Sequence, residues 1–188
     1  MIKIIQERYN FDNYQIAQLK FLFLTLISEI SKILIISIFF TNEYYLFLWG
    51  LFIFQNMRSS TGGIHCQGYV SCLVASLLFF LLCIKLLPNI IISKTLQLIL
   101  MFVCTYFTYK TGHIVSPLHI KLSPKSIKDS KNRMTITIFC YSVLLFIMPK
   151  YRFISVGFWV IVLNTFQLLL STFMMGGEEN WEKILIKL

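Results

Sequence analysis

The sequence predicts an all-α, polytopic integral membrane protein with about six membrane-embedded helices and an amphipathic helix at its N-terminus. Hydrophobic residues make up 57% of the chain and charged residues only 13%, whereas soluble domains carry about a quarter charged residues. The apolar residues are gathered into long runs, so one large core does not account for them. We expect a single domain over residues 1–188, because the chain is short for two domains of ordinary size.

The basic excess is explained by membrane topology. The formal charge is +9, but no basic stripe interleaved with aromatic residues supports nucleic-acid binding. When the N-terminus, residues 56–72, residues 110–133 and the C-terminal tail are placed on one side, that side holds twelve of the 17 basic residues. The positive-inside rule then predicts a multi-pass protein of the cell membrane, with both termini and residues 56–72 on the cytoplasmic side.

The first fifth of the chain is predicted to hold a surface helix and one crossing. Apolar side chains recur along one side of a helix in residues 1–20, which is typical of a helix on the membrane surface or of a cytosolic cap. Phe21–Phe40 is long enough to cross a hydrocarbon core of about 30 Å. Glu29 and Lys32 lie on one face of this helix. We expect them to pair or to face the protein interior, because an isolated charge at mid-membrane is unfavourable.

Shorter apolar runs follow. Tyr44–Phe54 is short for a full crossing and is interpreted as a thinned, tilted or re-entrant segment, which makes it the weakest of the six crossings. Leu73–Leu87 and Ile90–Tyr109 are predicted to form a helical hairpin, because Pro88-Asn89 marks a tight turn between them.

The second half is predicted to hold a basic loop and another hairpin. Lys110–Arg133 reads as one extended loop, since Pro117 and Pro124 argue against a continuous helix. The second hairpin is expected to consist of Ile136–Met148 and Phe153–Met175. Gly176-Gly177 is expected to end the last helix, ahead of a short amphipathic tail.

The stretch Asn56–Cys72 interrupts the apolar runs with polar residues and glycines, and it contains His65 and Cys72. A thiol attacks a carbonyl group as the thiolate, and a neighbouring histidine can take its proton. The histidine can then protonate the leaving amine. The pair is therefore a candidate base and nucleophile, although a structural role for both residues is equally compatible with the spacing.

The spacing of His65 and Cys72 makes a geometric demand. Seven residues of a straight α-helix rise about 10.5 Å, which is too far for direct contact. The chain must therefore bend between the two residues, and the glycines Gly62, Gly63 and Gly68 permit such a path. We expect Cys72 near the start of the next helix, where the helix dipole favours a thiolate and backbone N–H groups can form an oxyanion hole.

The sequence gives less support to three other classes of function. A zinc site could draw on Cys66 or Cys72 with His113 and His119, but the usual ligand spacings are missing. A thiol redox protein is disfavoured because there is no C-x-x-C motif. A small transporter or peptide-export component, with a polar path lined by Glu29, Lys32, Asn164 and Gln167, lacks the internal repeats expected of one. No metal or cofactor is predicted.

The segment R-S-S-T-G-G-I-H-C-Q-G-Y-V-S-C, residues 58–72, resembles the signature of the accessory gene regulator B (AgrB) family. These are membrane cysteine endopeptidases of peptide quorum sensing. Arg58, Gly62, Gly63, His65 and Cys72 match the family pattern position by position. Cys66 departs from that pattern, which usually has a small residue such as alanine there. The length, the hydropathy profile and the basic segment S-P-L-H-I-K-L-S-P-K are also similar to the family.

The resemblance implies a substrate and a reaction. The substrate would be an AgrD-type pro-peptide with an acidic C-terminal tail, and the enzyme would be a homodimer in the lipid bilayer. Cys72 would attack the peptide bond before the tail and form a thioester, which a substrate side chain would then convert into a thiolactone or lactone ring. Arg58 would bind a carboxylate or support the oxyanion. The basic residues after position 120 would attract the tail, or would serve topology alone: Lys121, Lys125, Lys128, Lys131 and Arg133.

Overall fold

The computed structural model describes residues 13–61, 68–111, 124–148 and 151–185. Within these ranges the chain forms helices and no strand, which confirms the all-α class. The long helices are α2 (Asn13–Phe39), α3 (Tyr44–Thr61), α4 (Tyr69–Leu81), α5 (Lys94–Thr111), α6 (Pro124–Ile147) and α7 (Arg152–Leu185). Three short pieces join them: η1 (Thr41–Glu43), η2 (Leu82–Leu86) and η3 (Leu87–Asn89).

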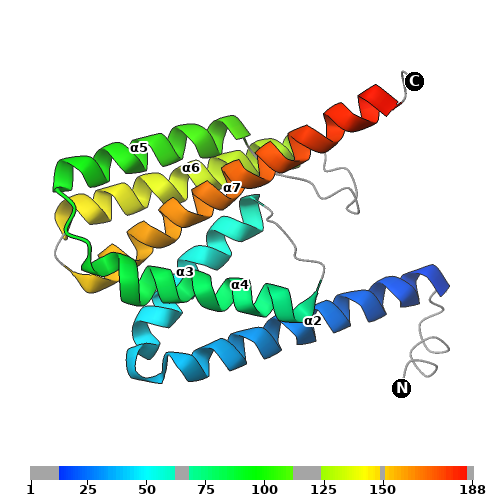
Figure 1. Cartoon of the computed structure of the whole chain (residues 1–188), viewed down its shortest axis with the longest axis horizontal. Coiled ribbons are helices and arrows are strands. Elements are labelled where there is room, and N and C mark those ends of the chain that lie inside the picture. Colours follow the sequence, from blue (N-terminus) through cyan, green and yellow to red (C-terminus); the bar gives the residue numbers. More distant parts are fainter. Residues whose placement is uncertain (1–12, 62–67, 112–123, 149–150, 186–188) are drawn as a thin grey trace.

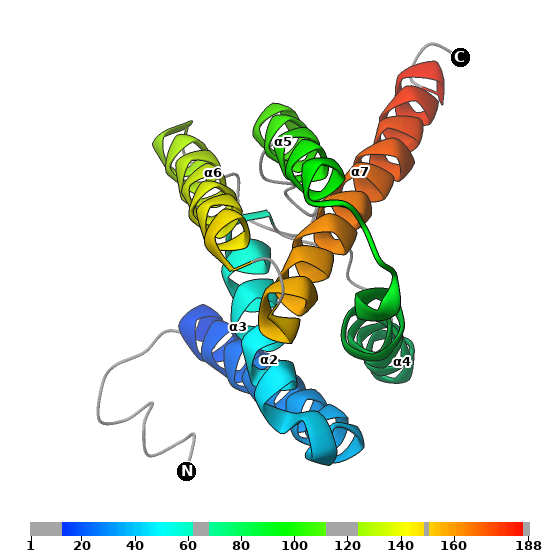
Figure 2. The ribbon, with the colours of Figure 1, turned by 90° about the vertical axis from the view of Figure 1, so that its left-hand side faces the viewer.

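Helix α3 is the centre of the molecule. It packs against α6 and α7, while α5 packs on the far side of those two helices and α2 packs against α4. Figure 1 and Figure 2 show α5, α6 and α7 together, with α3 between them and α2. The core includes the fully buried side chains of Phe47, Phe80, Ile138 and Ile161. The Phe47 and Phe80 rings meet edge to face, with their centroids 5.1 Å apart, a favoured geometry for aromatic pairs.

The ends of the helices fall into two groups. In Figure 1 the start of α2, the end of α3, the start of α4, the end of α5 and the end of α7 all lie toward the right-hand side. This side, which carries Arg58 and Cys72, is called the site end below. The other side, which carries η1 and the start of α7, is called the opposite end. The grouping agrees with the predicted placement of the basic segments on one side, and the cytoplasmic assignment of that side stays a prediction.

The outer surface is apolar, as expected for a membrane protein. Leu24, Ile27, Leu34 and Ile38 are exposed along α2. Two helical stretches among the described residues are long and apolar enough to cross a membrane, Tyr69–Asn89 and Arg152–Phe173.

A bent pair of helices offers a third crossing. Phe23–Phe39 and Thr41–Ser60 meet at 90°, as a broken span or a re-entrant loop would. This geometry agrees with the re-entrant interpretation of Tyr44–Phe54. The described residues therefore contain two to three candidate spans, and the six predicted crossings are not confirmed.

The predicted boundary between a surface helix and the first crossing is wrong within the described residues. Helix α2 runs without a break from Asn13 to Phe39, so residues 13–20 belong to the same helix as the expected crossing Phe21–Phe40. No glycine or proline separates the two segments, so nothing in the local sequence stops the helix. Residues 1–12 of the predicted surface helix lie outside the described residues.

Two further boundaries were misjudged because a helix breaker was given too much weight. Helix α6 begins at Pro124, so the last ten residues of the expected loop Lys110–Arg133 are helical. Proline is favoured in the first turn of a helix, where its missing N–H has no partner to lose. Helix α7 continues through Gly176-Gly177 to Leu185, because glycine lowers helix stability without forbidding the conformation.

The first predicted turn is confirmed at η3, where Pro88 lies in the turn between α4 and α5. Helix α6 ends at Ile147 and α7 begins at Arg152, as the second predicted turn requires; Pro149 and Lys150 themselves lie outside the described residues. The first pair is not a packed hairpin, however. After η3 the chain crosses to the other side of the molecule, where α5 packs against α6 and α7.

Candidate active site at the start of α4

Cys72 lies in the first turn of α4, as the sequence predicts. Gly68 precedes the helix with extended backbone angles (φ −124°, ψ 147°). Its carbonyl oxygen accepts hydrogen bonds from the Cys72 N–H at 3.1 Å and from the Ser71 hydroxyl at 2.9 Å. Because Gly68 is extended, no straight helix runs from His65 through Cys72. The first-turn N–H groups ahead of Cys72 have no partner within the helix and give this end a partial positive charge.

The Cys72 thiol is buried beside a charged pair on α2. The residues Cys72 and Lys32 are 8% and 7% exposed. The Lys32 ammonium group donates a hydrogen bond to Cys72 Sγ at 3.6 Å and a second one to Glu29 Oε1 at 2.8 Å. The pairing of Glu29 with Lys32 is thus confirmed, and its closeness to Cys72 is new.

Further contacts hold the start of α4 against α2. The Tyr69 and Ser31 hydroxyl groups share a hydrogen bond of 2.8 Å. The Lys32 ammonium lies 5.6 Å from the centroid of the Tyr69 ring, within the range of a cation–π interaction. These contacts fix the position of the thiol relative to the ammonium group.

Two cavities that share Arg58 lie at this part of the molecule, and Cys72 lines the second of them. The first, of about 250 Å³, lies between α2, α3 and α4 and is lined by Glu29, Lys32 and Arg58 among others. The second, of about 200 Å³, is lined by Arg58, Cys72 and Gln167 with apolar neighbours. Because Arg58 lines both cavities, its side chain borders the cavity of the thiol as well as that of the charged pair.

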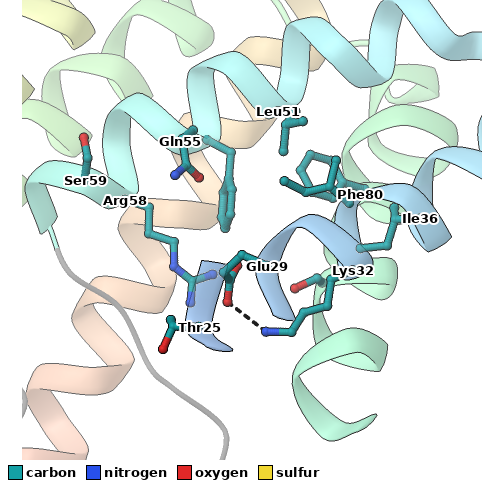
Figure 3. A pocket seen from close by; sticks show the side chains of 12 residues that line it. Thr25, Glu29, Lys32, Ile36, Leu51, Gln55, Arg58, Ser59 and Phe80 are labelled. Carbon is teal, nitrogen blue, oxygen red and sulfur yellow. Dashed lines mark hydrogen bonds and ion pairs between the residues drawn. The ribbon is translucent and has the colours of Figure 1, made fainter. Parts of the chain in front are cut away.

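Arg58 comes from the last turn of α3 and leans on its own helix. Its guanidinium carbon is 5.5 Å from the centroid of the Phe54 ring, one turn earlier. Figure 3 shows the side chain pointing toward Glu29, while the dashed line joins Glu29 to Lys32. Two cations from two helices thus share the surroundings of one carboxylate, and a thiol lies beside them.

Some predicted site residues cannot be placed. His65, Gly62, Gly63, Cys66 and Lys121 lie outside the described residues, as do His113 and His119. The predicted contact between His65 and Cys72 therefore stays a prediction. Across the described ranges, no group of three or more histidine, cysteine, aspartate or glutamate side chains could hold a metal ion.

The predicted basic cluster is partly described, and it lies on a helix. Lys125, Lys128 and Arg133 are exposed on the first turns of α6. The Lys131 ammonium lies 5.7 Å from the centroid of the Tyr109 ring on α5. These cations are at the site end of the molecule but outside both cavities.

The sequence did not connect three members of the site with Cys72. Lys32 was expected to pair with Glu29 or to face the protein interior, and Lys32 and Gln167 were otherwise named only for the polar path of a transporter. An ionisable residue within an apolar run is itself a signal of function. Ser76 and Gln167 also line the cavity that contains Cys72. Ser76 is one helical turn beyond Cys72, so the spacing could have indicated it. Gln167 comes from α7, and only the packing of α7 against α3 brings it there.

Comparison with known proteins agrees with the resemblance. A family model described as Accessory gene regulator B matches residues 1–168. A curated AgrB-like protein of Clostridium beijerinckii is 39% identical over 59 residues. The chain spans 30% of the length of that relative, and the same stretch is 30% of this chain. No solved structure matches the chain. Because the family model covers most of the sequence, the chain belongs to the accessory gene regulator B family.

Proposed function

We propose that this protein is a membrane-embedded cysteine endopeptidase that processes an AgrD-type pro-peptide of quorum sensing. The observation that carries the proposal is the environment of Cys72. Its thiol lies in the first turn of a helix, accepts a hydrogen bond from an ammonium group and lines a cavity. A helix N-terminus and a neighbouring cation are the surroundings that favour a reactive thiolate.

The other described cysteines lack this combination. Cys83 and Cys104 are buried among apolar side chains of the core, where a thiol behaves as a small hydrophobic group. Cys140 is exposed on α6. Cys72 is therefore the described cysteine best suited to act as a nucleophile.

The proposed reaction has two steps. In the first, the Cys72 thiolate attacks the carbonyl carbon before the acidic tail, the C–N bond breaks, and His65 gives its proton to the leaving amine. The products are a thioester on Cys72 and the free tail. In the second, a thiol or hydroxyl group of the substrate gives its proton to His65 and attacks the thioester carbonyl, the C–S bond to Cys72 breaks, and the ring forms as the Cys72 thiolate is released. No nucleotide or metal is needed to balance either step.

The burial of Cys72 helps to protect the thioester intermediate of the proposed reaction from water. Forming a thioester from an amide is unfavourable, and water would hydrolyse the thioester before the ring closes. Cys72, which is 8% exposed within the protein, is shielded from bulk water, as such an intermediate requires. Release of the tail draws the reaction forward. Arg58 and Gln167 are among the polar residues that line the cavities, and in this proposal they orient the peptide.

We also propose how the enzyme is oriented in the membrane and what it contacts there. The active site opens toward the cytoplasm, where the pro-peptide is made, and the exposed apolar helices contact lipid. The lysines at the start of α6 attract the acidic tail by electrostatic steering. The enzyme acts as a homodimer, as the resemblance implies.

Co-expression with the pro-peptide tests the proposal. We expect Cys72→Ala and His65→Ala to abolish release of the tail, as measured by mass spectrometry of the peptide, while Cys66→Ala and Cys83→Ala retain it. The thermal midpoint of each variant in detergent controls for folding. Cleavage that persists in a folded Cys72→Ala variant contradicts the proposal, and transport of an uncleaved peptide would favour the export alternative.

A further inference from the structure

We propose that Lys32 stabilises the thiolate of Cys72 and that Glu29 sets the strength of this effect. The catalytic part of the inference rests on the proposed function. The Lys32 ammonium nitrogen joins two partners by hydrogen bonds: Glu29 Oε1 at 2.8 Å and Cys72 Sγ at 3.6 Å. The thiol and the ammonium belong to different helices, 40 residues apart in sequence.

A solely structural explanation accounts for the geometry less well. An ion pair of residues three apart on one helix needs no third partner, and the Glu29 side chain is 44% exposed. Lys32 is nevertheless turned inward, where its side chain is 9% exposed. Placing an ammonium group in such a position is unfavourable unless its hydrogen bonds are satisfied. A thiolate provides a partner of opposite charge for the buried ammonium, whereas a neutral thiol provides only a weak acceptor.

Charged and polar groups from four helices surround Cys72. From α2 come the Lys32 cation and the Glu29 anion, and from α3 comes the Arg58 cation, which lines the same cavity as Cys72. The first turn of α4 adds the helix dipole and the uncharged hydroxyl of Tyr69, and α7 contributes the uncharged amide of Gln167. Of these groups, the Lys32 ammonium contacts the Cys72 sulfur directly, at 3.6 Å, and an opposite charge at such a distance favours the charged form of a titrating group.

Lys32 neither gives nor takes the proton in this arrangement. The thiol proton leaves to the general base, and the ammonium stays charged before and after, stabilising the negative sulfur by its hydrogen bond. The same contact recurs when the ring closes, because Cys72 then leaves the thioester as a thiolate. Lys32 therefore contributes to both steps of the proposed reaction.

Alkylation of the thiol tests the inference without any substrate. The full-length protein in detergent is treated with iodoacetamide between pH 5.5 and 9.5, and the rate at each cysteine is followed by peptide mass spectrometry. We expect Lys32→Met to slow alkylation of Cys72 at neutral pH by about ten- to a hundredfold, the range for a lost hydrogen bond to a charged group. The rate should recover at higher pH, so that the whole profile moves to more alkaline values.

Glu29→Gln is expected to move the alkylation profile of Cys72 in the opposite direction from Lys32→Met. The amide keeps an oxygen that can accept the Lys32 hydrogen bond, but it removes the negative charge. The thiolate is then favoured, and the alkylation profile of Cys72 should move to lower pH. Lys32→Arg keeps the cation and should restore the Cys72 rate to within a few-fold of the original.

Two internal controls separate an electrostatic effect from a disturbed fold. Alkylation of the exposed Cys140 should be unchanged in every variant. Lys85→Met removes a lysine that lies over the Phe40 ring at the opposite end and should leave the Cys72 profile unchanged. An unmoved profile in Lys32→Met overturns the inference. So does a shift in the same direction in Lys32→Met and Glu29→Gln, or a folded Lys32→Arg variant as slow as Lys32→Met.

The two proposals fail in different ways. If pro-peptide cleavage depends on Cys72 but alkylation of Cys72 is indifferent to Lys32, only this inference fails. If the alkylation profiles move as expected while no peptide is cleaved, the thiolate–ammonium pair stands and the endopeptidase proposal fails.

Discussion

Two ion pairs at opposite ends of the molecule show how differently the same chemistry can be used. At the site end, Lys32 and Glu29 are three residues apart on one helix, and the ammonium group also reaches a thiol. At the opposite end, Arg152 and Glu43 are 109 residues apart and lie 2.6 Å from each other. The second pair joins η1, at the bend between α2 and α3, to the start of α7.

The two ion pairs differ in whether they join separate elements of the fold. Breaking Arg152–Glu43 releases two elements from each other, so the consequence falls on stability. Breaking Lys32–Glu29 separates no two elements, because both residues lie on α2, so the consequence falls on the neighbouring thiol. We therefore expect substitutions at the site end to change processing more than stability, and substitutions at the opposite end to do the reverse.

Arg58→Met is expected to give the largest effect of those that test this contrast. Arg58 lines both cavities, and loss of a charge-assisted hydrogen bond to the substrate should lower kcat/KM for pro-peptide cleavage by about ten- to a hundredfold. Arg58→Lys keeps the charge but not the planar fork and should recover only part of the activity. A loss of thermal stability that fully explains the loss of cleavage would contradict a role in the site.

Gly157→Ala tests packing at the opposite end. A Cβ at this position of α7 would meet the Tyr141 hydroxyl oxygen and Ile53 Cδ1 well inside normal contact distance. Overpacking of this kind costs about 1–3 kcal/mol, and the better helix propensity of alanine offsets up to about 1 kcal/mol of it.

The matched control for Gly157→Ala is Gly50→Ala on α3. Its Cβ would lie 3.4 Å from Val156 Cγ1 and 3.6 Å from Val160 Cγ2, in ordinary contact. Thermal unfolding in detergent should show a lower midpoint for Gly157→Ala and an unchanged or slightly higher one for Gly50→Ala. Equal midpoints in the two variants would contradict close packing of α3, α6 and α7.

Arg152→Met should have a smaller effect. The Arg152 side chain is half exposed, and exposed ion pairs contribute about 1 kcal/mol or less. We expect a modest drop in the thermal midpoint with alkylation of Cys72 unchanged, measured on the same preparation. A change in the alkylation profile of Cys72 would show that the two ends of the molecule are coupled. It would contradict the expectation that substitutions at the opposite end change stability more than processing.

The lysines at the start of α6 should give the smallest effect. Lys125→Gln or Lys128→Gln is expected to lower the rate of pro-peptide cleavage about two- to threefold at low ionic strength, because steering by exposed charges weakens when one cation is removed. The effect should disappear at high salt, where such interactions are screened. Lys94→Gln, at the opposite end, is the matched control. Cleavage indifferent to both the substitutions and the salt would leave these lysines a role in topology alone.

The lengths of the apolar runs predicted the helical class of the fold. Helix ends were misplaced where a single proline or a glycine pair was given too much weight. The all-α class and the re-entrant interpretation of Tyr44–Phe54 follow from the lengths of the apolar runs, and the turn at η3 follows from Pro88-Asn89. The end of the loop at Pro124 and the end of α7 at Gly176-Gly177 were misplaced, because proline and glycine act by position as much as by type. The number of crossings depends on how α2 and α3 meet, which local patterns do not determine.

In the site, the sequence predicted the feature that depends on neighbouring residues, and it did not predict the contacts between residues far apart in the chain. The placement of Cys72 at a helix start followed from Gly68 and the spacing to His65. The contact between Cys72 and Lys32 depends on two helices that are 40 residues apart, and Gln167 comes from a third. An ionisable pair within an apolar run was the available signal, and it identified the residues without identifying the thiol they face.

The most direct test of the account is to trap the thioester on Cys72. The purified protein is mixed with pro-peptide, quenched in acid and measured as intact protein by mass spectrometry. We predict an added mass equal to the pro-peptide without its C-terminal tail, lost on treatment with hydroxylamine and absent in Cys72→Ala. Tail release with no such adduct in the wild type, or an adduct that persists in Cys72→Ala, would contradict the central claim that Cys72 is the nucleophile.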